Sequence, residues 1–148
     1  MIRSETEYQQ AVSRIEDEKL RLDQQREQLT QMGLTAEEIQ RAMEPLISFY
    51  YQLIEEVEYY ERLKRGDLGE ALNLEGIGRM LVAARIARGL TQRQLAQKLE
   101  VHESQVSRDE RNEYHGITLE RAAKVLKALN LELKSQFIGP VLPLKDAS

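Results

Sequence analysis

Apolar residues are thinly spread along the first part of the chain, at helical spacing. They lie three, four or seven positions apart and therefore share one stripe of a helix: Tyr8, Val12, Ile15, Leu22 and Leu29. Charged Lys19 and Arg26 interrupt this stripe. No Gly or Pro occurs before Gly33, whose backbone freedom suits a helix end. The pattern predicts one long helix, from about residue 5 to residue 32, packed on a single partner helix.

A second long helix is predicted to begin at about Ala36, because Thr35 and Glu38 have the spacing of a capping box. Pro45 lies inside the pattern and either kinks this helix or begins a new one. Beyond it, one broad apolar face is expected from Leu46, Tyr50, Leu53, Ile54, Val57, Tyr60 and Leu63. Two long helices joined by a short turn predict an acidic helical hairpin over residues 1–66, suited to dimerisation or partner binding.

Four of the six tyrosines fall in this second helix: Tyr50, Tyr51, Tyr59 and Tyr60. Aromatic side chains can stack on the bases of single-stranded nucleic acid, or they can pack in a core or an interface. The neighbouring glutamates, Glu55, Glu56, Glu58 and Glu61, would repel phosphate. The packing role is therefore the favoured interpretation.

Several glycines then loosen the chain, and we place a linker at residues 67–75. Gly76 and Gly78 precede a helical pattern with no strand before it, which excludes a dinucleotide-binding loop. Gly89, Thr91 and Thr118 mark helix boundaries in a compact unit at residues 76–134. The expected inward positions are Ile77, Leu81 and Ala84, then Leu95, Ala96 and Leu99, then Val101 and Val106, and finally Leu119, Ala122, Val125, Leu126 and Leu129.

The segment Leu131–Phe137 begins with alternating apolar and polar residues, which indicates a short strand. Pro140 and Pro143 then mark an irregular tail at residues 135–148. The fold class we predict is all-α: a hairpin of long helices followed by a compact unit of four to five short helices.

The charge is divided between these two parts. Residues 1–75 hold 17 acidic and 9 basic side chains, whereas residues 76–148 hold 8 acidic and 12 basic ones. A basic unit joined to an acidic one is typical of a nucleic-acid-binding domain with a separate partner-binding region, although chance clustering of solvated charges gives the same pattern. The chain has no Cys and only two histidines, His102 and His115, which leaves no thiolate zinc site, so we expect no metal and no cofactor.

The N-terminus opens on polar residues, unlike a signal peptide, and no apolar run is long enough to span a bilayer. We therefore expect a soluble cytoplasmic protein without membrane contact. We also expect no enzyme. The carboxylates around His115 lack a second histidine that would complete a ligand set or a catalytic group.

Two short helices joined by a tight turn, at residues 90–111, fit a groove-reading unit. Small Ala96 would allow close crossing of the helices, and Val106 would anchor the second one. The outer face of this second helix carries hydrogen-bonding side chains: Glu103, Ser104, Gln105, Ser107 and Arg108. An ordinary solvated face remains the alternative interpretation.

Residues 77–131 resemble the Cro/C1-type (XRE) helix-turn-helix domain. The resemblance is carried by Leu90-Thr91-Gln92, Leu95-Ala96, Leu99-Glu100-Val101, Val106-Ser107-Arg108, Glu110 and Thr118-Leu119-Glu120. It implies double-stranded DNA as the ligand. The matching positions imply that Gln92 contacts a phosphate or supports base-reading side chains, and that His102 caps the recognition helix. Glu103, Ser104 and Arg108 would face base edges, with Gln105 and Ser107 nearby, and Arg93, Lys98 and Arg111 would lie near phosphates.

Two positions depart from the family pattern. Glu100 stands where the family usually has Gly, which costs little only if its backbone is not left-handed. Asp109 replaces an apolar anchor, so we expect polar contacts at the end of the recognition helix, with Arg111, Tyr114 or His115 as partners. Asn112 is the residue in the following loop that best tolerates a left-handed conformation.

The resulting prediction is a transcriptional regulator, a dimeric repressor that reads a palindromic operator. Either the N-terminal helices or the Leu131–Phe137 segment would hold the homodimer. One alternative is an antitoxin that represses its own operon and binds a basic toxin through the N-terminal helices. Another is a protein-interaction adaptor without DNA binding. Four carboxylates that would lie near phosphates favour this alternative: Glu103, Asp109, Glu110 and Glu113.

Overall fold

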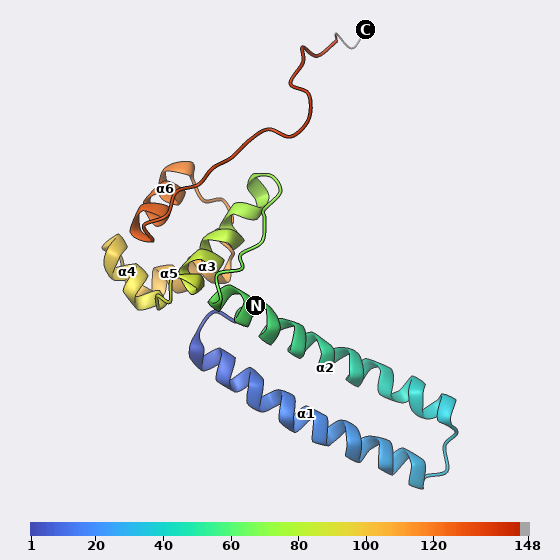
Figure 1. Cartoon of the computed structure of the whole chain (residues 1–148). Helices are drawn as coiled ribbons and strands as arrows, with labels where there is room; N and C mark the ends of the chain where they lie inside the picture. The colour runs from blue at the N-terminus through green and yellow to red at the C-terminus, as the bar shows by residue number, and fades with distance from the viewer. Residues whose placement is uncertain (146–148) are drawn as a thin grey trace.

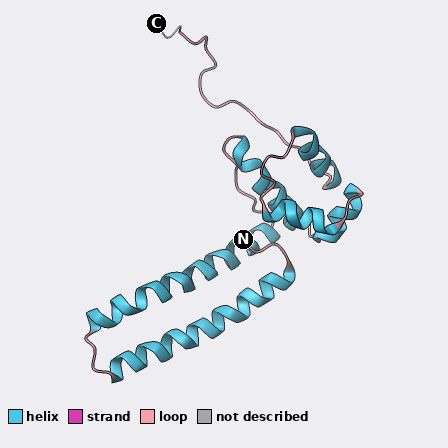
Figure 2. Cartoon of the chain, turned by 180° about the vertical axis from the view of Figure 1, so that it is seen from behind, coloured by secondary structure: helices cyan, strands magenta, loops and turns pink. Residues whose placement is uncertain are grey.

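The structure, a computed structural model, describes residues 1–145. Its helices are α1 (Glu5–Gln31), α2 (Ala36–Lys64), α3 (Ile77–Ala87), α4 (Gln92–Leu99), α5 (Glu103–Arg111) and α6 (Leu119–Ala128), with a 3₁₀ turn at Leu74–Gly76. No strand occurs in this part of the chain, which confirms the all-α class. Figure 1 shows α1 and α2 side by side as a hairpin that projects from the compact unit of α3 to α6. The same arrangement is seen from behind in Figure 2.

Local signals in the sequence define the hairpin. Ser4 caps α1 by accepting a hydrogen bond from the Glu7 amide, and Gly33 has a left-handed φ of 78° after the helix. Thr35 and Glu38 form the predicted capping box at the start of α2. Pro45 lies inside one continuous helix, so no new helix begins there. Because proline has no amide hydrogen, the helix continues without one of its internal hydrogen bonds.

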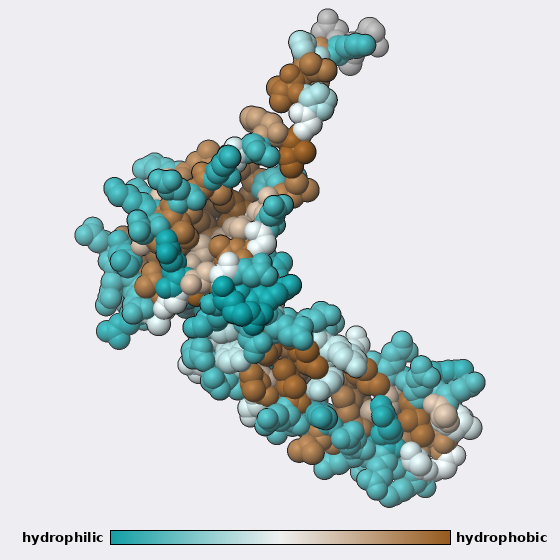
Figure 3. All heavy atoms as spheres, in the orientation of Figure 1, coloured by the Kyte–Doolittle hydropathy of each residue, from teal (hydrophilic) through white to brown (hydrophobic). Residues whose placement is uncertain are grey.

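The seam between the two long helices is thin. None of the residues Glu5–Gln31 is buried, and in α2 only Met43, Val57, Tyr60 and Leu63 are. Leu46, expected on the apolar face, is 43% exposed, although it lies on the same side of α2 as the buried Val57. Figure 3 shows apolar surface remaining along the visible side of the hairpin.

Helix α3 is the centre of the compact unit. Every residue from Leu81 to Ile86 is buried, including Arg85. Gly78 lies so close to the loop after α5 that a Cβ there would be 1.9 Å from the carbonyl oxygen of Glu113. This approach explains a glycine inside the first turn of the helix.

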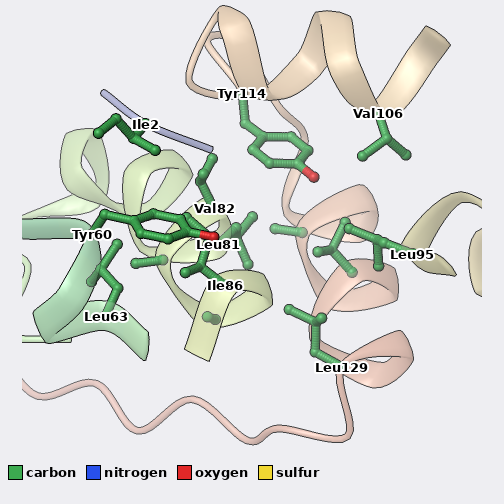
Figure 4. Packing of buried hydrophobic residues seen from close by; sticks show 14 of the residues in the cluster. Ile2, Tyr60, Leu63, Leu81, Val82, Ile86, Leu95, Val106, Tyr114 and Leu129 are labelled. Carbon is green, nitrogen blue, oxygen red and sulfur yellow. The ribbon is translucent and has the colours of Figure 1, made fainter. Parts of the chain in front are cut away.

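Helices α5 and α6 pack on α3, and α4 packs against α5 and α6, so that the apolar faces of all four meet in one core (Figure 4). Leu95 and Ala96 of α4, Val106 of α5, and Ala122, Val125 and Leu129 at α6 are buried, as predicted. Leu119 was expected to point inward and is 70% exposed. It is the first residue of α6 and lies at the end of the stripe formed by Ala122, Val125 and Leu126, although it is on the same side of the helix.

The base of the hairpin shares this core. Ile2, Tyr60 and Leu63 belong to the same buried cluster as Val82 and Ile86 (Figure 4). Next to it, the rings of Tyr8 and Tyr60 stack with centroids 5.2 Å apart. The Tyr8 hydroxyl donates to Glu61 Oε1 at 2.7 Å, and this bond raises the pKa of Tyr8 above its ordinary value. The four tyrosines of α2 therefore include a core residue, Tyr60, in line with the packing role.

The chain after α6 is extended and lies away from the domain (Figure 1). The predicted strand at Leu131–Phe137 is absent, because no second strand in the described chain supplies backbone partners. The Leu131 amide donates to the Leu126 carbonyl, and beyond it Phe137 is 93% exposed. Further along, large apolar side chains are also exposed: Ile138, Val141, Leu142 and Leu144.

Candidate nucleic-acid interface

Helices α4 and α5 are joined by a tight turn centred on Glu100. Thr91 caps α4 and forms a capping box with Gln94 that the sequence analysis did not identify. Glu100 adopts the left-handed conformation, with φ 57° and ψ 38°. Replacement of the family's glycine by Glu100 would cost little only with a backbone that is not left-handed, so it does carry a cost. A residue with a Cβ in this conformation costs about 1 kcal/mol relative to glycine. The turn is closed by the Val101 amide, which donates to the Ala96 carbonyl at 3.0 Å.

Helix α5 presents a polar outer face. Its N-cap is His102, whose Nδ1 accepts from the Ser104 amide at 3.2 Å and lies 2.8 Å from Ser104 Oγ. Val106 is buried and anchors the helix to the core. Exposed side chains cover the opposite face: Glu103, Ser104, Gln105, Arg108 and Arg111. Ser107 is half-buried beside them.

A buried ionic cluster supports this face from below. The Arg85 guanidinium pairs with both oxygens of Glu110, and its Nη2 lies 2.7 Å from Glu110 Oε2. Both side chains are almost fully buried. The Arg85 Nη1 also donates to the Leu90 carbonyl at 2.7 Å. Breaking such a pair is strongly destabilising because it leaves a buried charge without compensation.

Gln92 belongs to the same cluster. It is the first residue of α4, and its Nε2 donates to Glu110 Oε2 at 2.7 Å. The side chain is half-buried and is therefore held at the start of α4 by the recognition helix. Neighbouring Arg93 is exposed on the same turn, and Lys98 is exposed at the other end of α4. Gln92 thus has the geometry of a supporting residue.

The end of α5 is held by polar contacts, but with other partners than expected. Asp109 pairs with Arg121 of α6 at 2.7 Å, and the Tyr114 amide donates to the Asp109 carbonyl at 2.7 Å. The left-handed residues of this loop are Glu113 and Tyr114, whereas Asn112 has a φ of −91°. Asn112 is instead the C-cap, whose amide still bonds back to α5.

Tyr114 lies under this loop with its ring in the core. Burial raises the pKa of its hydroxyl well above the ordinary value, and the nearby carboxylates of Glu110 and Asp109 add to the effect. The hydroxyl has no hydrogen-bond partner among the described residues.

The sequence analysis missed the roles of Arg85 and Glu110. Glu110 was expected near phosphates, as one of the carboxylates that favour the adaptor hypothesis. It is 1% exposed, which removes it from the surface. The signal was present, since Arg85 follows Leu81 and Glu110 follows Val106 by four positions. Each charge therefore lies on the inward stripe of its helix, and the two have opposite signs.

Among residues 1–145, no group of three or more potential ligand residues is arranged to hold a metal ion. Within the same range, no helix is both long and apolar enough to cross a membrane.

The arrangement of α4, the turn and α5 on α3 and α6 is that of a helix-turn-helix DNA-binding domain. Comparison with protein-family models matches residues 81–135 to the helix-turn-helix family. This part of the chain is therefore a helix-turn-helix domain of the Cro/C1 (XRE) type. Comparisons with curated proteins and with solved structures found no match.

Proposed function

We propose that this protein is a dimeric transcriptional repressor that reads a palindromic operator with α5. The carrying observation is the division of α5 into two faces. Val106 and Glu110 are buried and fix the helix, whereas its opposite face is a continuous row of exposed polar side chains. A helix held rigidly from below and polar above fits the major groove of double-stranded DNA.

The exposed side chains suggest a division of labour. Arg108 fits guanine, because a guanidinium donates to O6 and N7 together. Ser104 and Gln105 would bond base edges nearby, and Glu103 would accept from cytosine or orient a neighbouring arginine. Arg93 and Arg111, which are both exposed, would bind phosphates, with His102 and Ser107 nearby.

A homodimer would supply the symmetry that a palindrome requires. The segment at the start of the tail, where apolar and polar residues alternate, would form one contact between the two copies. If two copies pair antiparallel about Leu133, Glu132 of one copy lies opposite Lys134 of the other, twice. Leu133 then faces its counterpart on the apolar side. Such pairing would also give the extended backbone the partners that one chain lacks.

The hairpin supports a second role, binding of a partner protein, as in the antitoxin alternative. Its surface combines exposed apolar side chains, Leu20, Phe49 and Tyr51, with a net acidic charge. A basic protein would complement both features. Because α1 and α2 bury few residues against each other, a second hairpin could also pack on this surface.

Selection of bound duplexes from a random library tests DNA reading directly. We expect enrichment of a two-fold symmetric sequence whose affinity falls steeply with salt concentration. Arg108→Ala should weaken binding to the selected duplex by about 10- to 100-fold and to a shuffled duplex by far less. Equal losses on both duplexes would remove Arg108 from base reading. Failure to bind any duplex at low salt would contradict the proposed function.

Co-purification tests the second role. A basic partner that is retained by the full chain and lost with Phe49→Glu, at unchanged DNA affinity, would support it. Retention by both proteins would contradict a contact at this surface.

A further inference from the structure

The first residues of the chain lie in the helix-turn-helix core, although they precede the hairpin in sequence. Ile2 is 5% exposed and packs in the cluster of Val82, Tyr60 and Tyr114 (Figure 4). The segment is fixed on its other side, since the Arg3 amide donates to Glu7 Oε2 at 2.8 Å. Residues 1–4 thus connect α1 to the domain 80 residues further along the chain rather than hanging free.

Arg85 bonds this segment directly to the recognition helix. Its Nη2 donates both to the Arg3 carbonyl, at 2.8 Å, and to Glu110 Oε2, at 2.7 Å. The same Glu110 oxygen accepts from Gln92 Nε2. One unbroken series of hydrogen bonds therefore runs from the N-terminal segment through the centre of α3 to the ends of α4 and α5.

The geometry of arginine makes this series cooperative. A buried guanidinium must keep acceptors for its N–H groups, and its planar fork fixes where they lie. Losing the Arg3 carbonyl leaves an N–H of Arg85 without an acceptor in a nearly buried site. The guanidinium then turns or admits water, and Glu110 and Gln92 have to follow it.

We infer that residues Met1–Ser4 are a positioning element for the DNA-reading face, acting through Arg85 and Glu110 on Gln92 and α5. The inference rests on the proposed DNA binding and adds a regulatory consequence to it. Because coupling is reciprocal, DNA binding tightens the N-terminal segment, and displacement of that segment weakens DNA binding.

The test compares two substitutions that each truncate a buried apolar side chain, Ile2→Ala before α1 and Met43→Ala in α2. Both side chains are buried, but only Ile2 belongs to the domain core. Binding is measured with the full chain and the duplex selected by the wild-type protein, at a temperature at which circular dichroism shows both variants to be folded. Ile2→Ala should weaken this binding by about 3- to 30-fold. Met43→Ala should stay within about twofold. Arg85→Lys, which keeps the charge but not the fork, should combine with Ile2→Ala less than additively.

A second measurement uses the protein without DNA. Ile2→Ala should shift the backbone amide resonances of α5, from Glu103 to Arg111, and Met43→Ala should leave them in place. Equal effects of the two substitutions, or unchanged α5 resonances in Ile2→Ala, would overturn the inference. If Ile2→Ala does not fold, Ile2→Val replaces it with the same expected order. If no duplex binds the wild type, the proposed function fails, and the resonances alone decide the coupling.

Discussion

Helix α1 has 27 residues and buries none of them, whereas α3 has 11 residues and buries seven. The short helix is surrounded by α5, α6 and the base of α2, and the long one has only α2 beside it. Burial on most of its sides makes α3 the centre of the compact unit, whose core the base of the hairpin shares. The hairpin is one layer with exposed apolar side chains: Leu20, Leu46, Phe49 and Tyr51.

Removal of the buried carboxylate should have the largest effect. Glu110→Ala leaves Arg85 without its charge partner, and we expect a loss of about 3–5 kcal/mol in the free energy of unfolding. Urea unfolding followed by circular dichroism measures it. Glu27→Ala, at an exposed position of α1, is the control and should change stability by less than about 0.5 kcal/mol. A loss below about 1 kcal/mol for Glu110→Ala would contradict a structural role for the ion pair.

The same truncation in the two regions measures the contrast directly. Leu95→Ala removes a fully buried side chain of the domain and should cost about 3 kcal/mol, through lost burial and a cavity. Leu22→Ala, in the half-buried seam of α1, should cost about 1 kcal/mol or less.

Thermal unfolding over a hundredfold range of protein concentration sharpens this comparison. If a second copy covers the hairpin, the effect of Leu22→Ala grows with concentration, because oligomerisation stabilises by mass action. A concentration-independent effect of Leu22→Ala as large as that of Leu95→Ala would show that the hairpin of a single chain is closed.

Tyr114→Phe should stabilise the domain by about 1 kcal/mol at neutral pH, since it removes a buried hydroxyl without a partner. Burial raises the pKa of Tyr114 above its ordinary value of 10.0, so its protonated form is favoured by folding. The free energy of unfolding is therefore unaffected by this group at pH values well below 10.0. It falls as the pH rises above 10.0, because the unfolded chain can then ionise Tyr114 while the folded chain keeps it protonated. Urea unfolding at pH 7 and above pH 10 should therefore show a smaller alkaline loss in Tyr114→Phe. Tyr51→Phe, at an exposed position, should match the wild type at both. A destabilised Tyr114→Phe would indicate that the hydroxyl has a partner.

The smallest effect is expected at the turn. Glu100→Gly relieves the left-handed conformation and should raise the free energy of unfolding by about 0.5 kcal/mol, after the greater chain entropy of glycine is subtracted. Unfolding of the variant and the wild type under the same conditions measures this change in free energy. Glu103→Gly, in α5, is the helical control and should be destabilised. A loss of stability in Glu100→Gly would mean that the Glu100 side chain makes a contact that outweighs its strain.

The helices and most of the core follow from local rules, and the sequence predicts them well. Thr35, Gly33 and Gly89 mark boundaries by backbone chemistry that acts over a few residues. What escapes prediction depends on distant partners. Arg85 and Glu110 are 25 positions apart, and the Arg3 carbonyl is 82 positions from Arg85.

The expected strand at Leu131–Phe137 fails for the same reason. Alternation describes a segment that is able to pair, and pairing requires a second strand that this chain does not contain among its described residues. The expected DNA-contacting face could be predicted only in part. Its exposed residues on α5 follow from helical periodicity, whereas the support under Gln92 could be seen only in three dimensions.

Pro45 has a dynamic consequence. Without its amide hydrogen, the Arg41 carbonyl loses the bond that would tie one turn of α2 to the next, at a point where Met43 is the nearest buried side chain. Segments with few buried contacts and missing internal bonds open at lower free energy than the molecule as a whole. Among the helices, the end of the hairpin near Gly33 should therefore exchange its amide protons with solvent first, and α3 should exchange them last. The molecule has a graded order of opening, from the hairpin tip toward the DNA-binding domain.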